Sequence, residues 1–108
     1  MRYLVTGTYV EPGPLLPPQQ VVQMLEQVVI PSLESMVALE KEKKIVAGGI
    51  LTGAREGVFI IEASSHEEVT RTLMNLPFWG LLTWQVNPIE SFEFRAKLEH
   101  EGVARMKK

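Results

Sequence analysis

One unbroken run, from Ser65 to Pro88, constrains the fold of this chain more than any other part of its sequence. Ser65 is followed three residues later by Glu68, the spacing of a capping box in which each side chain satisfies a free backbone N–H of the other residue. A helical apolar stripe, an exit at Pro77 and an alternating stretch follow directly. The run therefore predicts a capped helix that leads into the last strand of a sheet.

The first part of the chain predicts a strand followed by a long helix. Residues alternate and are rich in β-branched and aromatic types from Arg2 to Val10, and the Pro12–Pro14 segment ends this strand. Apolar residues then recur at helical spacing from Pro17 to about Lys43. Because Pro31 removes an internal hydrogen bond, we expect a kink or a break near Val28.

A hairpin is expected in the middle of the chain. Two short apolar runs, Ile45–Leu51 and Gly57–Ala63, are joined by residues that suit a turn, which predicts an antiparallel pair. The first run contains Gly48 and Gly49, which either form a β-bulge or admit the close approach of a ligand or a partner backbone.

The last strand is expected from Leu81 to Phe94, with Pro88 at a sheet edge or a bulge. The resulting βαββαβ order, with both helices on one face of an antiparallel sheet, predicts an α+β, ferredoxin-like fold. We expect this domain over residues 1–94. Residues 95–108 are expected to form a C-terminal extension, a helix that packs on a partner or frays in solvent.

The predicted sheet carries more apolar surface than one helix-covered face accounts for. The residues that suggest this are Val5, Phe59, Ile61, Leu82 and Trp84. Two sheets packed face to face would bury such a surface. We therefore expect a homodimer whose two sheets enclose a shared interior.

Composition excludes several classes of function. The 108 residues carry a formal net charge of −2, which gives no basic field for nucleic acid, and the absence of cysteine removes disulfides, thiolate catalysis and soft metal sites. His66 and His100 stand far apart without a spaced carboxylate cluster, so no metal site is expected. Without a signal sequence or an apolar run near the roughly 20 residues that span a bilayer, we expect a cytoplasmic protein that has no membrane partner.

Residues in the second half of the chain carry a resemblance to a known family. The segment Thr72–Pro77, which reads Thr-Leu-Met-Asn-Leu-Pro, together with Trp84, Val86 and Ile89 in the following strand, resembles the muconolactone isomerase family. The match has no gap from about Gly57 to Ile89. The YciI-like family is a neighbouring resemblance, through the Gly-Gly strand and the Pro-Phe pair before the last strand.

The resemblance implies a dimeric α/β barrel, often assembled into larger rings. It also implies proton transfer within a small unsaturated lactone or cyclic acid, without a metal or an organic cofactor. Glu62 aligns with an acidic residue of the family and is the expected catalytic base, although a strand-end, solvated position is the alternative. The expected ligand-binding residues are Tyr3, Tyr9, Thr83, Trp84 and Gln85. Core packing is the alternative for the two tyrosines.

The chain departs from the family at positions that matter for proton transfer. Where the isomerases carry ionisable side chains on the first and last strands, this chain has neutral ones, namely Leu4, Thr6, Thr8, Thr83, Gln85 and Asn87. Two functions therefore stay open. One is a cofactor-independent isomerase that uses Glu62, and the other is a non-catalytic dimeric barrel that binds a small neutral molecule or serves as an assembly unit.

Overall fold

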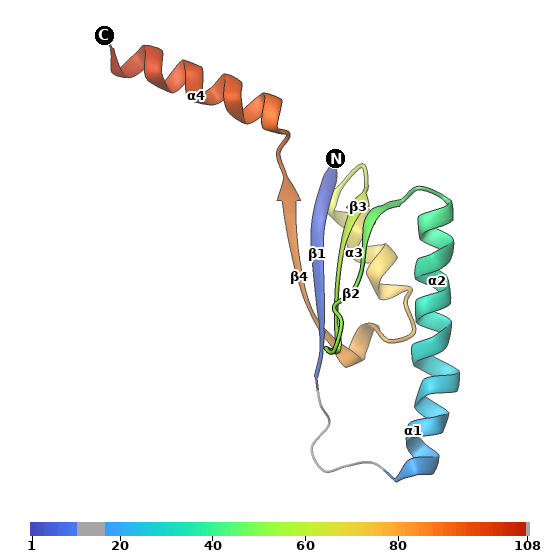
Figure 1. Cartoon of the computed structure of the whole chain (residues 1–108). Helices are drawn as coiled ribbons and strands as arrows, with labels where there is room; N and C mark the ends of the chain where they lie inside the picture. Colours follow the sequence, from blue (N-terminus) through green and yellow to red (C-terminus); the bar gives the residue numbers. More distant parts are fainter. Residues whose placement is uncertain (11–16, 108) are drawn as a thin grey trace.

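The computed structural model describes residues 1–10 and 17–107 and shows one antiparallel sheet with helices against it (Figure 1). The Pro12–Pro14 segment, expected to end the first strand, lies outside the described residues. In the order in which they lie side by side, the strands are β2 (Ile45–Ile50), β3 (Glu56–Glu62), β1 (Arg2–Tyr9) and β4 (Leu82–Ile89). The pairings are antiparallel, so the predicted ferredoxin-like α+β fold is confirmed.

The long helical segment after β1 is interrupted where the sequence predicts a break. It consists of α1 (Pro18–Met24), a π-helical stretch η1 (Leu25–Val29) and α2 (Ile30–Lys41). Pro31 lies just after the π-helical stretch and has no N–H to bond the carbonyl four residues earlier. The helix continues past the missing hydrogen bond of Pro31 because the preceding turn is widened to a π turn.

The β2–β3 hairpin contains a β-bulge and an unusual glycine. The register shifts between Ile45 and Ala47, and Gly48 follows with a φ of 139°, a backbone conformation that side chains rarely allow. A Cβ atom on Gly48 would lie 2.4 Å from the carbonyl oxygen of Val58. The neighbouring Gly49 has no atom within 4 Å of such a Cβ, so only Gly48 is required by the geometry.

Helix α3 (His66–Met74) begins with one of the two hydrogen bonds of the predicted capping box, and the second bond goes to a different residue. The Ser65 hydroxyl accepts a hydrogen bond from the N–H of Glu68 at 3.2 Å. The Glu68 carboxylate accepts from the hydroxyl and the N–H of Ser64 rather than from the N–H of Ser65, at 2.6 and 2.7 Å. These bonds, the hydroxyl first, lower the pKa of Glu68. A short 3₁₀ turn, η2 (Trp79–Leu81), then leads into β4.

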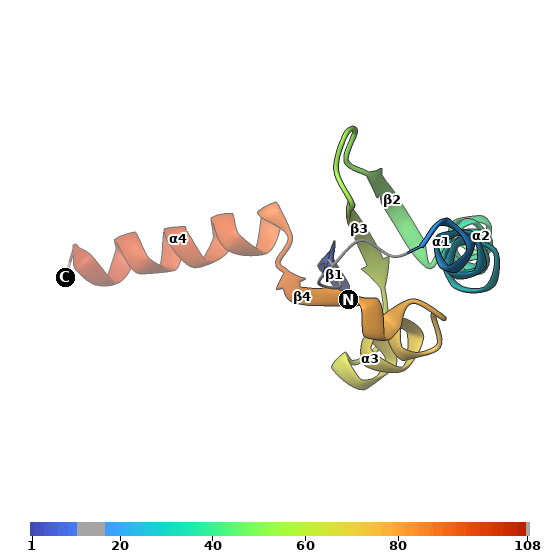
Figure 2. The ribbon, with the colours of Figure 1, turned by 90° about the horizontal axis from the view of Figure 1, so that it is seen from below.

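The helices cover one face of the sheet, and the core lies between them and the strands (Figure 2). Fully buried side chains here include Tyr3, Val5, Ile61 and Leu73. On the edge strand β4, Pro88 sits where a missing N–H is tolerated, as the sequence predicts.

The five apolar residues on which we based the two-sheet interior lie on the helix-covered face. Val5 is paired with Phe59 on one side, and Gly7, on the same face, is paired with Trp84 on the other. Side chains on this face alternate along each strand, which places Ile61 and Leu82 there as well. These residues therefore give no support to a two-sheet interior, because α2 and α3 already cover their face and the other face is the one open to a partner.

The C-terminal helix α4 (Phe92–Met106) begins earlier than expected and leads away from the sheet (Figures 1 and 2). β4 ends at Ile89, and the Ser91 hydroxyl caps α4 by accepting from the N–H of Phe94 at 3.1 Å. The radius of gyration is 18.3 Å, against about 13 Å for a compact domain of this length. The difference reflects the projecting helix.

Candidate functional site

A cavity of about 440 Å³ lies between the helix-covered face of the sheet and the α1–η1–α2 segment. Its size is within the range typical of small-molecule sites. The helical wall is apolar and is formed by Val21, Met24, Leu25, Val29, Leu33 and Met36. The π-helical stretch therefore supplies part of the wall, through Leu25 and Val29.

Two glycines directly opposite each other create the space for this cavity. Gly7 on β1 is paired with Gly57 on β3, and both line the cavity. Because neither has a side chain, the layer that fills the rest of this sheet face is thinner here. A Cβ on Gly7 would lie 2.8 Å from the ring of Trp84, so the ring takes the place of a side chain at Gly7, whereas a Cβ on Gly57 would lie 3.3 Å from the side chain of Ile50.

An aromatic group closes one end of the cavity. Trp84 is stacked on Trp79, with ring centroids 5.8 Å apart, and meets Phe78 edge-on at 6.1 Å. The indole N–H of Trp84 donates to the carbonyl oxygen of Trp79 at 3.1 Å, which fixes the ring in place. Trp84 and Phe78 contribute to the cavity wall.

The ionisable residues among the described lining are Tyr9, Arg55 and Glu56, all near the β2–β3 turn. The Arg55 guanidinium lies 5.4 Å from the ring centroid of Tyr9, a cation–π arrangement. The Tyr9 hydroxyl donates weakly to the sulfur of Met24 at 3.9 Å. Glu56 is paired with Thr8, whose side chain is on the open face, so the pairing directs the Glu56 carboxylate away from the cavity.

A buried serine, which sequence reasoning missed, fastens the helical wall to the aromatic end. Ser32 on α2 is completely buried. Its hydroxyl donates to the carbonyl oxygen of Val28 at 2.7 Å and accepts from the backbone N–H of Phe78 at 2.9 Å. A serine between Pro31 and Leu33 was the available sign, since a serine within a helix commonly bonds back to the preceding turn.

Of the five residues predicted to bind a ligand, Tyr9 and Trp84 line the cavity. Tyr3 is buried in the core, where its hydroxyl donates to the sulfur of Met1 at 3.7 Å. Thr83 and Gln85 are exposed on the open face of the sheet. A ligand-binding role for each of them remains a prediction, but the structure does not bring the five together.

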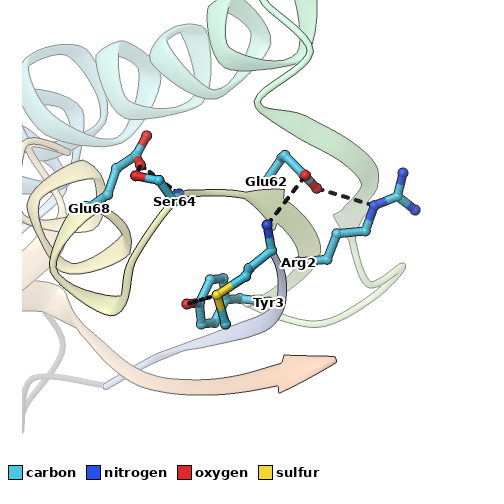
Figure 3. A network of polar contacts seen from close by, with 6 residues as sticks. Arg2, Tyr3, Glu62, Ser64 and Glu68 are labelled. Atoms are coloured by element: carbon cyan, nitrogen blue, oxygen red, sulfur yellow. Dashed lines mark hydrogen bonds and ion pairs between the residues drawn. The ribbon is translucent and has the colours of Figure 1, made fainter. Parts of the chain in front are cut away.

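The predicted base Glu62 lies at the far end of β3, on the open face (Figure 3). Its carboxylate accepts from Nε of Arg2 at 3.2 Å and from the N-terminal amine at 3.5 Å, and half of its side chain is exposed. Glu62 lies five positions after Gly57, which is about 16 Å along an extended strand. Glu62 is therefore outside the cavity.

Within residues 1–10 and 17–107, no three histidine, cysteine or acidic side chains come together in a way that could hold a metal ion. No helix in this part of the chain is long and apolar enough to cross a bilayer.

Solved structures of two enzymes resemble this chain. Muconolactone isomerase is similar with a TM-score of 0.68 and 20% sequence identity over 84% of this chain and 90% of that one. The 5-chloro-2-hydroxyhydroquinone dehydrochlorinase of Burkholderia phenoliruptrix AC1100, solved with 2,5-dihydroxybenzoquinone, is similar with a TM-score of 0.60 and 22% identity over 87% of this chain and 98% of that one. No protein-family model and no curated protein sequence matches the chain. The predicted resemblance is confirmed at the level of the fold, which this chain shares with muconolactone isomerase.

Proposed function

We propose that this protein binds a small, uncharged and mainly apolar molecule in the cavity between the sheet and the α1–η1–α2 segment. The observation that carries the proposal is the Gly7–Gly57 pair, which leaves a space of about 440 Å³ beside an ordered aromatic wall. Apolar walls with few polar groups at one end are typical of small-molecule sites. Tyr9 and Arg55 at the turn supply those groups.

A neutral aromatic probe tests this proposal. 2-Naphthol should bind the protein and change its tryptophan emission, since Trp84 lines the cavity. Gly57→Val should weaken binding by at least about tenfold, because the new side chain enters the space that the probe needs. Gly49→Val is the matched control, since it places the same side chain on a neighbouring strand where no atom lies within 4 Å of the new Cβ. Failure of 2-naphthol to bind the unmodified protein would overturn the proposal, as would equal binding by both variants.

Proton transfer of the muconolactone isomerase type is the alternative function, and the likeness in fold favours it. A general base must lie within hydrogen-bond reach of the proton that it removes. Glu62 is outside the cavity and ion-paired with Arg2, so we expect it to take no part in such a reaction.

Deuterium exchange into muconolactone in heavy water, followed by NMR, separates the two functions. We expect exchange at the buffer rate, with and without Glu62→Gln. Protein-dependent exchange that Glu62→Gln abolishes would establish the isomerase and make Glu62 its base. Exchange that survives the substitution would also contradict pure binding and would direct attention to Tyr9 at the turn.

We also propose that two copies pair through the open face of the sheet. The residues on this face are neutral over the middle of the strands and combine apolar with hydrogen-bonding side chains, namely Leu4, Thr6, Thr8, Val58, Ile60, Thr83, Gln85 and Asn87. A face of this kind can pack on a copy of itself without burying unpaired charge. Light scattering that shows only monomers at micromolar concentration would overturn this pairing.

A further inference from the structure

Within the described part of the chain, helix α4 buries none of its apolar side chains. No residue of Phe92–Met106 is buried, and Phe92 and Met106 are 97% and 86% exposed. Phe94 and Leu98, four positions apart and hence on one face, are also exposed, and Gly102 continues this face one turn later. The molecule measures 69 Å along its longest axis because this helix projects from it.

A projecting helix of this length requires a surface to pack on. Isolated helices shorter than about 12 to 15 residues are marginal in water, and α4 has 15 residues. The Ser91 cap and the ion pairs of Arg95 with Glu99 and Glu90 supply local support. Exposed ion pairs of this kind contribute little to stability, because water and salt screen their charges. Packing of the apolar face is therefore the missing source of stability.

The chain carries a second unpartnered apolar surface, a groove between α2 and β2. The groove encloses about 170 Å³ and is lined by apolar residues that include Leu33, Met36, Val37 and Ile50. Ile30, Leu33 and Val37 follow one another at helical spacing on α2, and Ile30 and Val37 are 46% and 48% exposed. This line of α2 is the kind of ridge against which another helix packs.

We propose that α4 of one copy docks in the α2–β2 groove of a second copy. The strand order β2-β3-β1-β4 puts the groove at one edge of the sheet and the origin of α4 at the other. Figure 2 shows α4 leading away from α1 and α2, and only two residues, Glu90 and Ser91, separate it from β4. The helix of the same chain cannot reach the groove without crossing the sheet, so the occupant comes from another molecule.

The charges of α4 favour a protein surface over a membrane. The helix has no net charge from its acidic and basic side chains, which are three glutamates at positions 93, 99 and 101 and three basic residues, Arg95, Lys97 and Arg105. Helices that lie on anionic membranes instead carry a basic polar face. On α2, Glu34 and Glu40 flank the apolar line and are available to Arg105, which falls two turns beyond Leu98 on the same face. Two such contacts about a two-fold axis give a closed dimer in which each copy donates one helix and receives one.

Because the chain contains no cysteine, single-cysteine variants can test this docking in the full-length protein. A tagged Val37→Cys protein is mixed with an untagged Leu98→Cys protein and treated with a short bismaleimide. We expect a cross-linked pair of one tagged and one untagged chain. Ala96→Cys replaces Leu98→Cys as the matched control, since a residue two positions away lies on the opposite side of α4, and it should cross-link at least about tenfold less.

Leu98→Asp provides a second measurement that does not depend on cross-linking. A charge in the docked face should lower the helix content seen by circular dichroism by about the share of α4, while the sheet domain keeps its melting temperature. Equal cross-linking by the Leu98→Cys and Ala96→Cys proteins would overturn the proposal. So would an α4 that stays helical in Leu98→Asp, or one that becomes protected only when anionic phosphatidylserine vesicles are added.

Discussion

Replacing Gly48 by alanine is expected to destabilise the protein by about 3 kcal/mol or more. Two costs combine at this position. The φ of 139° is a conformation in which alanine is strained, and the new Cβ would lie 2.4 Å from the carbonyl oxygen of Val58 and 2.5 Å from Phe59. The colliding atoms are two backbone atoms of β3 and the Cβ of Phe59, which is fixed to that backbone, so no side-chain rotation can relieve the contact. Such a loss is a large share of the free energy of unfolding of a typical domain, which is about 5–15 kcal/mol.

Chemical denaturation of Gly48→Ala and Gly49→Ala measures this effect with its control. The two glycines are neighbours on the same strand, but Gly49 has ordinary backbone geometry and open space around its Cα. Gly49→Ala should therefore stay within about 0.5 kcal/mol of the unmodified protein. If Gly48→Ala were equally mild, β2 would not pair with β3 in the register that the structure shows, and the bulge between Ile45 and Ala47 would be misplaced.

The sequence predicted the fold well because its signals are local. Alternation along β1, the proline-interrupted helix and the Ser65 cap each depend on residues close together in the chain, and each appears where it was expected. The predicted end of β4 was wrong because two local signals compete there. The alternating pattern continues to Phe94, but Ser91 can cap a helix, and this competing local signal determines that α4 starts at Phe92.

What the sequence could not show is which face of the sheet the helices cover. Alternation shows which residues of one strand share a face, as it does for the strands that carry Val5, Phe59 and Trp84. It does not show which of the two faces meets α2 and α3, because the crossover connections determine that. The prediction of an apolar open face depended on that choice and was wrong. The open face is instead neutral and mixed in character, which still suits pairing between copies.

The candidate site was predictable only in part, for the same physical reason. Tyr9 was named because its phenol could hold a ligand oxygen, and both Tyr9 and Trp84 line the cavity. The Gly7–Gly57 pair, which makes the cavity, arises from the β1–β3 register between positions 50 residues apart, and no local pattern reveals it. Glu62 was selected as the remaining acid on a predicted strand and through the family resemblance, and it lies on the other face from the cavity that the structure shows.

Replacing Trp84 by alanine is expected to cost about 3 kcal/mol of stability and to abolish binding of 2-naphthol. The value is at the low end for a tryptophan because the ring is partly exposed to the cavity. The substitution removes the stack on Trp79, the edge contact with Phe78 and the hydrogen bond to the carbonyl oxygen of Trp79. It also removes the surface that a flat apolar molecule would contact.

Two further variants separate the structural role of Trp84 from its role in binding. Trp84→Phe keeps an aromatic ring above Gly7 but cannot donate to Trp79, so it should lose about 1 kcal/mol and retain most of the probe affinity. Thr83→Ala changes the neighbouring, exposed position on the open face and should alter neither property by more than about 0.5 kcal/mol. A loss below that value for Trp84→Ala would mean that the ring does not form part of the packed wall. In that case the cavity would lack its fixed aromatic end, and the proposed site would have to be abandoned together with the ligand class inferred from it.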